Sequence, residues 1–256
     1  MSKLEIHQFP CLSDNYGFLI HDPEADTTAA IDTPEVGPIE AGLRTHGWQL
    51  THILNTHHHF DHAGGNEELK DKTGCLIIGP RDEADKVPGI DKEVGDGDTF
   101  QFGTHEVQVI GVPGHTLGHI AYYFPDDGVA FVGDALFALG CGRVFEGTPD
   151  QMWASLDKLM KLPDDTTIYC AHEYTQANAR FAVTIEPGNA DLQARVKEID
   201  SLRAHGKPTV PTTIGLERLT NPFVRPASEE IQRTVDLPGG EPAAVFTEVR
   251  HRKDTF

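Results

Sequence analysis

The stretch THHHFDH, residues 56–62, holds five side chains that can bind a metal ion or move a proton. On a loop leaving a strand, His57 and His59 are two residues apart and can point to the same side. Asp61 and His62 come after the chain has turned, which the Ala-Gly-Gly sequence behind them allows because glycine imposes few steric limits. One loop can therefore offer two histidines to one ion, and an aspartate with a histidine to another.

Short apolar or alternating runs fill the first two-thirds of the chain, and their length and β-branched or aromatic content predict strands. Several of these runs end in a histidine or an aspartate, at positions where a rigid scaffold can bring such groups together. The predicted strands are LEIHQF (4–9), YGFLI (16–20), TAAI (28–31), HILNT (52–56), CLIIG (75–79), HEVQVIGV (105–112), HIAYYF (119–124), VAFVG (129–133) and TIYCA (167–171). The groups at strand ends are Asp32, the histidine loop, His115, Asp134 and His172.

Each ion on the histidine loop needs further ligands, and the other strand ends supply them. We predict one ion held by His57, His59, His115 and Asp134, and a second held by Asp61, His62, His172 and Asp134. Asp134 has two carboxylate oxygens and can bridge both ions. Imidazole with carboxylate suits zinc, iron or manganese, and the lack of thiolate ligands argues against a structural zinc site. We therefore expect two divalent ions per chain, with zinc preferred.

The remaining polar residues of these segments receive other roles. His58 lies in the middle of the histidine run and should point away from its neighbours, so no ligand role is expected for it. Asp32 is expected to accept a hydrogen bond from a ligand rather than to bind metal. For His119 two roles stay open, since it can orient the site through a hydrogen bond or simply cap a strand.

The pattern changes near residue 173, where alternating runs end and helical spacing begins. We predict a catalytic α/β domain over 1–172 and a mostly helical domain over 173–256. A helix over 149–162 has Thr148 as its N-cap, proline in its first turn and Gln151 completing a capping box. Further helices are predicted after Asn189 and over 242–253.

Composition excludes several classes of protein. The net charge is −19, from 40 acidic and 21 basic residues, so the field repels nucleic-acid backbones. The four cysteines form no CxxC pair and are expected to be reduced. No apolar stretch is long enough for a membrane span, and the N-terminus does not have the pattern of a secretory signal. A cytoplasmic monomer that contacts neither membrane nor nucleic acid is expected.

Four motifs in this order resemble the metallo-β-lactamase superfamily: THHHFDH, GHTLGH (114–119), FVGDALF (131–137) and CAHEYT (170–175). Within it, SDNYGFLI, GCGRVFEGTPDQM and VRHRKD resemble the glyoxalase II (hydroxyacylglutathione hydrolase) family over nearly the whole length. The resemblance implies an α/β fold, a four-layer αβ/βα sandwich with a C-terminal helical domain. It also implies a binuclear site with the seven ligands above, and an S-acylglutathione substrate.

The substrate implied above all is S-D-lactoylglutathione, which such an enzyme cleaves in methylglyoxal detoxification. Family glutathione contacts map onto Arg143, Phe145, Tyr174, Arg250 and Lys253. Relatives often carry lysine and tyrosine at the first two of these positions, so the substrate is expected to be bound more weakly or in a different arrangement here, with the metal chemistry unchanged. Arg250 and Lys253 share a helix face. From the residues alone they could also be a solvated helix end with favourable charges, and the resemblance favours binding.

The expected reaction is attack on the thioester carbonyl by a metal-bridging hydroxide, held by Asp134 and Asp61. Metal binding lowers the pKa of water toward ~7. The thiolate leaving group, from a thiol of pKa ~8.5, needs no strong general acid.

Four alternative functions stay open. They are a persulfide dioxygenase of the same superfamily, a nuclease, a β-lactam hydrolase, and a non-enzymatic binding protein on a degenerate site. The charge disfavours the nuclease, the basic tail disfavours the first and the third, and intact ligands disfavour the last.

Overall fold

The computed structural model describes residues 3–256, which divide into two compact units. Unit 1 comprises the chain up to Gly111 together with Leu117–Gly133, and unit 2 comprises Val112–Thr116 together with Asp134–Phe256. This division differs from the boundary at 172/173 predicted from the sequence, which stays a prediction. Each unit is described by itself below.

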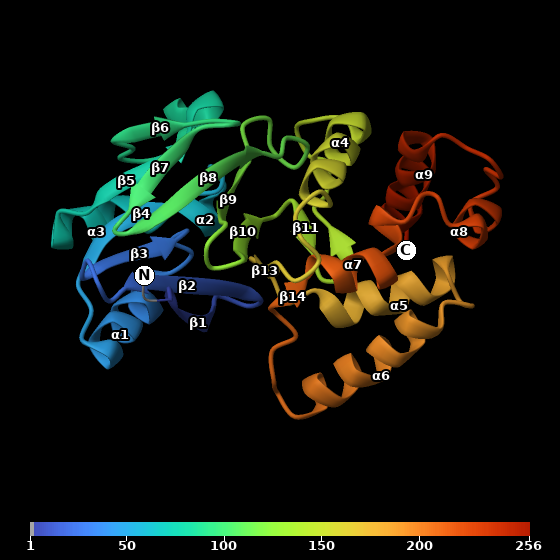
Figure 1. Cartoon of the computed structure of the whole chain (residues 1–256), viewed down its shortest axis with the longest axis horizontal. Coiled ribbons are helices and arrows are strands. Elements are labelled where there is room, and N and C mark those ends of the chain that lie inside the picture. The colour runs from blue at the N-terminus through green and yellow to red at the C-terminus, as the bar shows by residue number, and fades with distance from the viewer. Residues whose placement is uncertain (1–2) are drawn as a thin grey trace. The chain divides into compact units, whose positions relative to one another are not determined.

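Unit 1 contains a mixed sheet of six strands in sequential order, antiparallel at β1–β3 and parallel from β3 to β6. Its parallel connections carry helices α1 and α3, which lie along the sheet in Figure 1. Ile39 and Leu43 of α1 and Leu69 of α3 pack in one core with Leu19 and Ile53 of the sheet. The bounds are β1 Glu5–Cys11, β2 Asn15–Asp22, β3 Thr27–Ile31, α1 Val36–His46, β4 Leu50–Leu54, α2 Phe60–Ala63, α3 Asn66–Thr73, β5 Leu76–Pro80, the 3-10 helix η1 Arg81–Lys86 and β6 Lys92–Val94.

An antiparallel run of four strands forms the second layer of strands in unit 1: β7 (Thr99–Phe102), β8 (His105–Gly111), β9 (Ile120–Phe124) and β10 (Val129–Gly133). It packs on the first sheet. The rings of Phe18 and Phe131 lie 5.6 Å apart edge to face, and the buried Tyr122 hydroxyl donates to the carbonyl of Asn55 at 2.8 Å. Unit 1 is therefore a sandwich of two sheets with helices outside the first.

Unit 2 contains most of the helices, α4 to α9 among the described residues. Helix α4 begins with the predicted capping box of Thr148 and Gln151, and Asn189 caps α6. In α5 and α6, Ala179, Ala182, Leu192 and Ile199 form a small core with Leu139. The bounds are β11 Leu136–Phe137, β12 Gly140–Cys141, α4 Pro149–Leu159, β13 Thr167–Cys170, α5 Thr175–Ile185, α6 Ala190–Ala204, β14 Thr212–Thr213, α7 Ile214–Thr220, η2 Pro222–Val224, α8 Glu229–Thr234 and α9 Pro242–Asp254.

The predicted strands all occur, with ends shifted by at most two residues, and the helix expected over 242–253 is α9. One local expectation was incomplete. The second half of the histidine loop is the short helix α2, because the amides of Ala63 and Gly64 bond back to the carbonyls of His59 and Phe60. This turn separates the pair His57 and His59 from Asp61 and His62. None of the described helices is long and apolar enough to cross a membrane.

Candidate metal centre and substrate pocket

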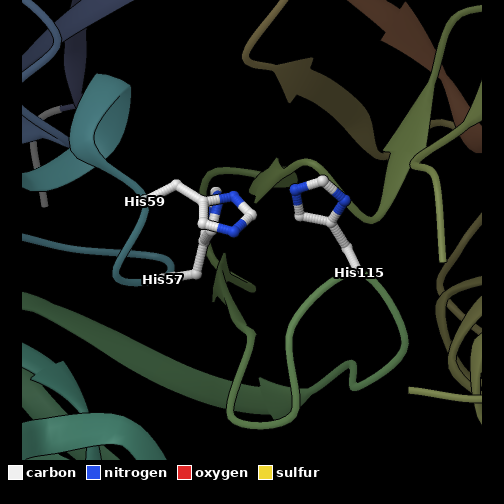
Figure 2. Close-up of side chains that lie close together, drawn as sticks. All are labelled: His57, His59 and His115. Carbon is white, nitrogen blue, oxygen red and sulfur yellow. The ribbon is translucent and has the colours of Figure 1, made fainter. Parts of the chain in front are cut away.

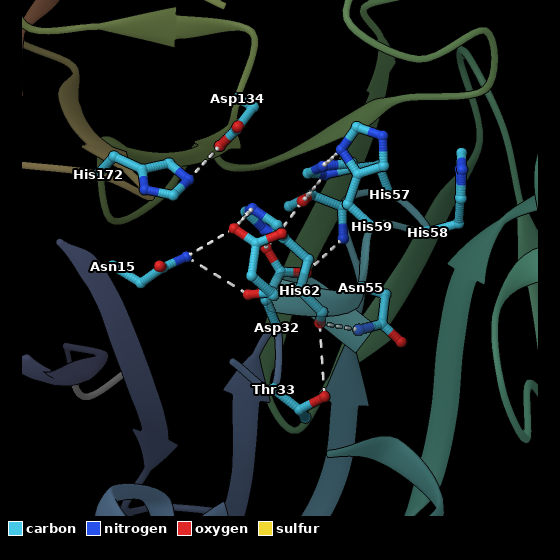
Figure 3. A network of polar contacts seen from close by, with 12 residues as sticks. Asn15, Asp32, Thr33, Asn55, His57, His58, His59, His62, Asp134 and His172 are labelled. Atoms are coloured by element: carbon cyan, nitrogen blue, oxygen red, sulfur yellow. Dashed lines mark hydrogen bonds and ion pairs between the residues drawn. The ribbon is translucent and has the colours of Figure 1, made fainter. Parts of the chain in front are cut away.

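In unit 1, a buried carboxylate at the end of β3 organises the histidine loop. Asp32 accepts hydrogen bonds from the backbone amide of Thr56 at 2.7 Å and from the Thr56 hydroxyl at 2.8 Å. It also accepts one from Nδ1 of His62 at 2.8 Å, and both of these residues are labelled in Figure 3. Asp32 thus accepts a hydrogen bond from a candidate ligand, as predicted from the sequence. Because Asp32 holds both the start of the loop and the ring of His62, it fixes one part of the loop against the other.

The ring of His62 is held in one tautomer by this bond. A neutral imidazole that donates from Nδ1 carries its lone pair on Nε2. That Nε2 lies 3.6 Å from Oδ2 of Asp61, an oxygen that also accepts a hydrogen bond from Asn15 at 3.0 Å. A lone pair therefore faces a carboxylate, and a cation between them stabilises this arrangement.

His57 and His59 form the other pair of the loop. Nε2 of His57 lies 3.1 Å from Nδ1 of His59, and their rings meet edge to face (Figure 2). His57 is fully buried, stacks on the ring of His119 at 4.5 Å, and has its Nδ1 3.1 Å from the hydroxyl of Thr56. Two ring nitrogens turned toward each other can share one metal ion. The stack on His57 is compatible with the orienting role considered for His119, which stays a prediction.

In unit 2, Asp134 lies between two histidines. Its Oδ2 is 3.3 Å from Nε2 of His115. Its Oδ1 is 3.3 Å from Nε2 of His172, and Figure 3 shows this second pair. Nδ1 of His115 donates to the carbonyl of Arg143 at 2.8 Å, so a neutral His115 carries its lone pair on the nitrogen that faces Asp134. The carboxylate thus offers one oxygen beside each histidine, as a bridging ligand would.

The donor chemistry of both units fits divalent metal ions. In each unit, nitrogen lone pairs and carboxylate oxygens face each other. The Nδ1 atom of His62 is hydrogen-bonded to the Asp32 carboxylate, and that of His115 to the carbonyl of Arg143. Such partners are usual for metal-binding histidines. The four cysteines are free and buried, and none belongs to these clusters. The structure places four of the seven predicted ligands in unit 1 and three in unit 2; their coordination of shared ions stays a prediction.

A cavity of about 480 Å³ lies in unit 2, and His115 and Asp134 form part of its wall. The ring of Tyr174, which lines this cavity, stacks flat on that of His172 with centroids 4.7 Å apart, and the side chain of Phe145 is exposed. The five predicted glutathione contacts all line this cavity: Arg143, Phe145, Tyr174, Arg250 and Lys253. Two candidate metal ligands of unit 2, His115 and Asp134, therefore share one cavity with the candidate substrate contacts.

Positive charge is concentrated at this cavity in a protein of net charge −19. Burial lowers the pKa of Lys253, and the neighbouring Arg250, Arg180 and Arg143 lower it further. Arg250 is buried and is more constrained than its sequence position suggested: it pairs with Asp254 at 2.7 Å and donates to the carbonyl of Cys141 at 3.2 Å. Cations gathered around a cavity repel one another, and an anionic ligand bound in the cavity reduces this repulsion.

Some residues of the site were missed by the sequence analysis. Asn15 contacts Asp61, and Asn178 both lines the cavity and donates to the carbonyl of Ala138. The buried carboxylate of Glu83 contacts the histidine loop. Nothing in their spacing distinguishes these residues from ordinary polar residues, because their contacts come from segments distant in the sequence.

The chain was compared with proteins of known family. It is 55% identical over all of its 256 residues to a hydroxyacylglutathione hydrolase of Maricaulis maris, which it covers completely. It is 53% identical to the enzyme of that name from Methylococcus capsulatus, with 99% of each chain covered.

The chain belongs to the hydroxyacylglutathione hydrolase family.

Two family models match adjoining parts of this hydroxyacylglutathione hydrolase family member. Residues 26–172 match the metallo-beta-lactamase superfamily, and residues 173–256 match the hydroxyacylglutathione hydrolase C-terminus. Among solved structures, ETHE1 from Myxococcus xanthus is similar with a TM-score of 0.67 and 27% identity, covering 98% of this chain and 99% of that one. The BLEG-1 B3 metallo-beta-lactamase, at 20% identity, has a TM-score of 0.66 over 86% of this chain and 100% of its own. The predicted family and the predicted fold class, a metallo-β-lactamase sandwich followed by helices, are confirmed.

Proposed function

We propose that the chain hydrolyses S-D-lactoylglutathione and other S-2-hydroxyacylglutathiones to glutathione and the hydroxy acid, D-lactate in the first case, in methylglyoxal detoxification. The observation that carries this function is the full-length identity of 53–57% to enzymes named hydroxyacylglutathione hydrolase. The cationic cavity beside His115 and Asp134 supports it, because glutathione carries two carboxylates and the thioester must reach the candidate metal ligands. Thioester hydrolysis by a metal-dependent enzyme is the activity that fits both.

Binding of two metal ions is supported by the family and by the histidine and aspartate clusters of both units. We propose His57, His59, His115 and Asp134 as the ligands of one ion, and Asp61, His62, His172 and Asp134 as the ligands of the other. Zinc is the proposed metal, with iron and manganese as the alternatives that the same donors accept. When bound, the ions make water acidic enough to react at neutral pH and polarise the thioester carbonyl.

The side chains of this chain perform the remaining tasks. Asp134 and Asp61 hold and orient the attacking water through their carboxylate oxygens. Arg143, Arg250 and Lys253 hold the glutathione carboxylates, and charge-assisted hydrogen bonds of this kind are about twice as strong as neutral ones. Phe145 and Tyr174 offer ring faces to the peptide part of the substrate. The thiolate of glutathione leaves without a strong general acid, which fits a site where no side chain needs to donate a proton.

The protein is proposed to act in the cytoplasm as a monomer on a small-molecule substrate. Four free, buried cysteines are typical of proteins from reducing compartments. The net charge of −19 makes a nucleic-acid partner unfavourable. Residues 173–256 are proposed as the domain that binds glutathione, since Tyr174, Arg250 and Lys253 lie there.

The deciding experiment is an assay of the purified protein with S-D-lactoylglutathione, with elemental analysis of the same sample. We expect thioester cleavage under strictly anaerobic conditions and about two divalent ions per chain. Cleavage without oxygen excludes the persulfide dioxygenase alternative. A metal-loaded protein that leaves the thioester intact would contradict the proposed function.

The KM for S-D-lactoylglutathione is expected to rise as pH increases. The rise should begin at a lower pH than the pH at which an ordinary lysine loses its proton. The ammonium of Lys253 is present below its pKa and lost above it, and this pKa lies below the ordinary value of 10.5 because of burial and the neighbouring arginines. The measurement is the pH dependence of KM in the wild type and in Lys253→Met. The variant should have a flat KM across the window in which the wild type rises, and an identical rise in both would exclude Lys253 as its source.

A further inference from the structure

Glu83 is a buried carboxylate within a segment whose other charged residues are exposed. It lies in the 3-10 helix Arg81–Lys86, where the backbone leaves helical geometry at this residue (φ −141°, ψ 26°). Its side chain is 2% exposed, while Arg81, Asp82, Asp85 and Lys86 are exposed. A buried carboxylate is costly unless hydrogen bonds satisfy it. The hydrogen-bond partners of Glu83 therefore indicate why the side chain turns inward at this point of the backbone.

Both oxygens of Glu83 hold loops that carry histidines. Oε1 accepts the amide of His58 at 2.8 Å and lies 3.1 Å from Nδ1 of the same residue. Oε2 accepts the amide of Gly118 at 3.0 Å. A methyl group on Gly118 would lie 2.9 Å from Cγ of Glu83, so only glycine allows this approach. One carboxylate thus joins the loop of residues 56–62 to the loop that precedes β9.

The two anchored residues are the immediate neighbours of the stacked imidazoles. His58 stands between His57 and His59, and Gly118 precedes His119, whose ring stacks on His57 with an interplanar angle of 18°. Fixing the backbone at His58 and at Gly118 restricts where the rings of His57 and His119 can lie. His58, the middle histidine of the run, therefore contributes to this anchoring, because both its backbone amide and its ring contact Glu83.

We infer that Glu83 is a positioning residue, which sets the pair His57 and His59 for metal binding by holding His58 and Gly118. The inference rests on the proposed function in requiring that this pair binds metal. Hydrogen bonds from amides to a buried carboxylate are charge-assisted and short, so they keep the loop in one conformation before the metal arrives. Partners behind the ligands change metal affinity by about 10–100-fold when they are removed.

The test compares Glu83→Gln with Asp22→Asn in the full-length protein. Glutamine keeps the shape of Glu83 but turns an NH₂ group toward an amide that needs an acceptor. Asp22 is the matched control: it is buried in the same unit and accepts the amides of Thr104 and Glu24. It lies at the far end of β2 from Asn15, roughly 23 Å away along the strand.

Cobalt(II) is titrated into each metal-free protein, and both the dissociation constant and the visible ligand-field spectrum are recorded. We expect Glu83→Gln to bind one of its two cobalt ions, the one held by His57 and His59, about 10–100-fold more weakly and with an altered spectrum. Asp22→Asn should keep the wild-type affinity and spectrum even if it melts at a lower temperature. A loss of stability alone cannot produce that difference, because both variants lose buried hydrogen bonds.

Wild-type cobalt affinity and spectrum in Glu83→Gln would overturn the inference. If that variant does not fold, Gly118→Ala replaces it, because its methyl group displaces Glu83 from the same contact. Its cobalt affinity should fall in the same way, and an unchanged affinity and spectrum would again overturn the inference. A wild-type protein that binds no cobalt would instead contradict the proposed function, so the two failures are distinct.

Discussion

Replacing Asp134 with alanine is expected to remove bound metal and thioester turnover together. One oxygen of Asp134 lies 3.3 Å from Nε2 of His115 and the other lies 3.3 Å from Nε2 of His172. Alanine would leave both histidines without the carboxylate that lies between them. Loss of about 4 kcal/mol of metal-dependent stabilisation corresponds to a fall in kcat of about 10³-fold.

Metal content by elemental analysis and kcat with S-D-lactoylglutathione measure the effect of Asp134→Ala. The control is Asp126→Ala, which removes an exposed carboxylate from the turn between β9 and β10. It should keep two ions and normal turnover. If Asp134→Ala retained both its metal and its activity, the bridging role proposed for Asp134 would be wrong.

Lys253→Met is expected to weaken substrate binding without weakening the fold. Hydrogen bonds to charged groups contribute about 1.5–3 kcal/mol, so KM should rise about 10–100-fold while kcat changes little. The fold should tolerate the change, because burial and the nearby Arg250, Arg180 and Arg143 disfavour the ammonium in the folded chain. Between the lowered pKa and 10.5 the unfolded chain binds more protons, so the wild type should gain stability as pH rises through this window.

Steady-state kinetics and thermal unfolding of the metal-loaded protein test this second prediction. Lys197→Met is the control, since Lys197 is an exposed cation of α6 in the same unit. It removes one charge from the same helical region and should leave KM unchanged. A Lys253→Met variant with wild-type KM would exclude this ammonium from glutathione binding, and a lower melting temperature would contradict the stability argument.

At the cationic cavity, repulsion between like charges lowers the stability of the folded chain, in an arrangement that suits the binding of an anion. Like charges are gathered at one place in a strongly acidic protein, and an anionic ligand bound there would relieve their repulsion. Arg250 is held by Asp254 and the carbonyl of Cys141, so its position is fixed before any ligand binds. Lys253 has weaker internal contacts, a 3.3 Å hydrogen bond to the carbonyl of Ala177 among them. Prearranged cations of this kind bind carboxylates without a large ordering cost.

Local sequence patterns predicted the regular elements of this protein well. Alternating and β-branched runs gave the strands because side chains of a strand alternate between two faces. The capping box of Thr148 and Gln151 gave the start of α4, since both partners lie within one turn of chain. The seven candidate ligands could be named because histidine and aspartate cluster in THHHFDH and follow predicted strands. Each of these signals is contained in a short window of sequence.

Other features depended on residues that the sequence separates widely. Glu83 belongs to the polar run RDEADK, whose composition predicts an exposed surface segment. Its side chain is nevertheless buried and bonded to His58, 25 positions away. The hairpin of β11 and β12 is held by Glu217 and Asn221 of the helical segment, which bond to the backbone of Leu139 and Gly140. No periodicity connects residues about 80 positions apart, so such contacts cannot be read from the pattern.

The sequence by itself determined which groups are available for chemistry: the ligand types, their attachment to strand ends, the family, and the cations of the tail. Only the tertiary structure decided how those groups are held. It turned the lone pair of His62 toward Asp61 through Asp32, turned that of His115 toward Asp134 through the carbonyl of Arg143, and buried Glu83 behind His58. The physical reason is that metal chemistry depends on the direction of each lone pair, and that direction is set by hydrogen bonds between segments that meet only when the chain is folded.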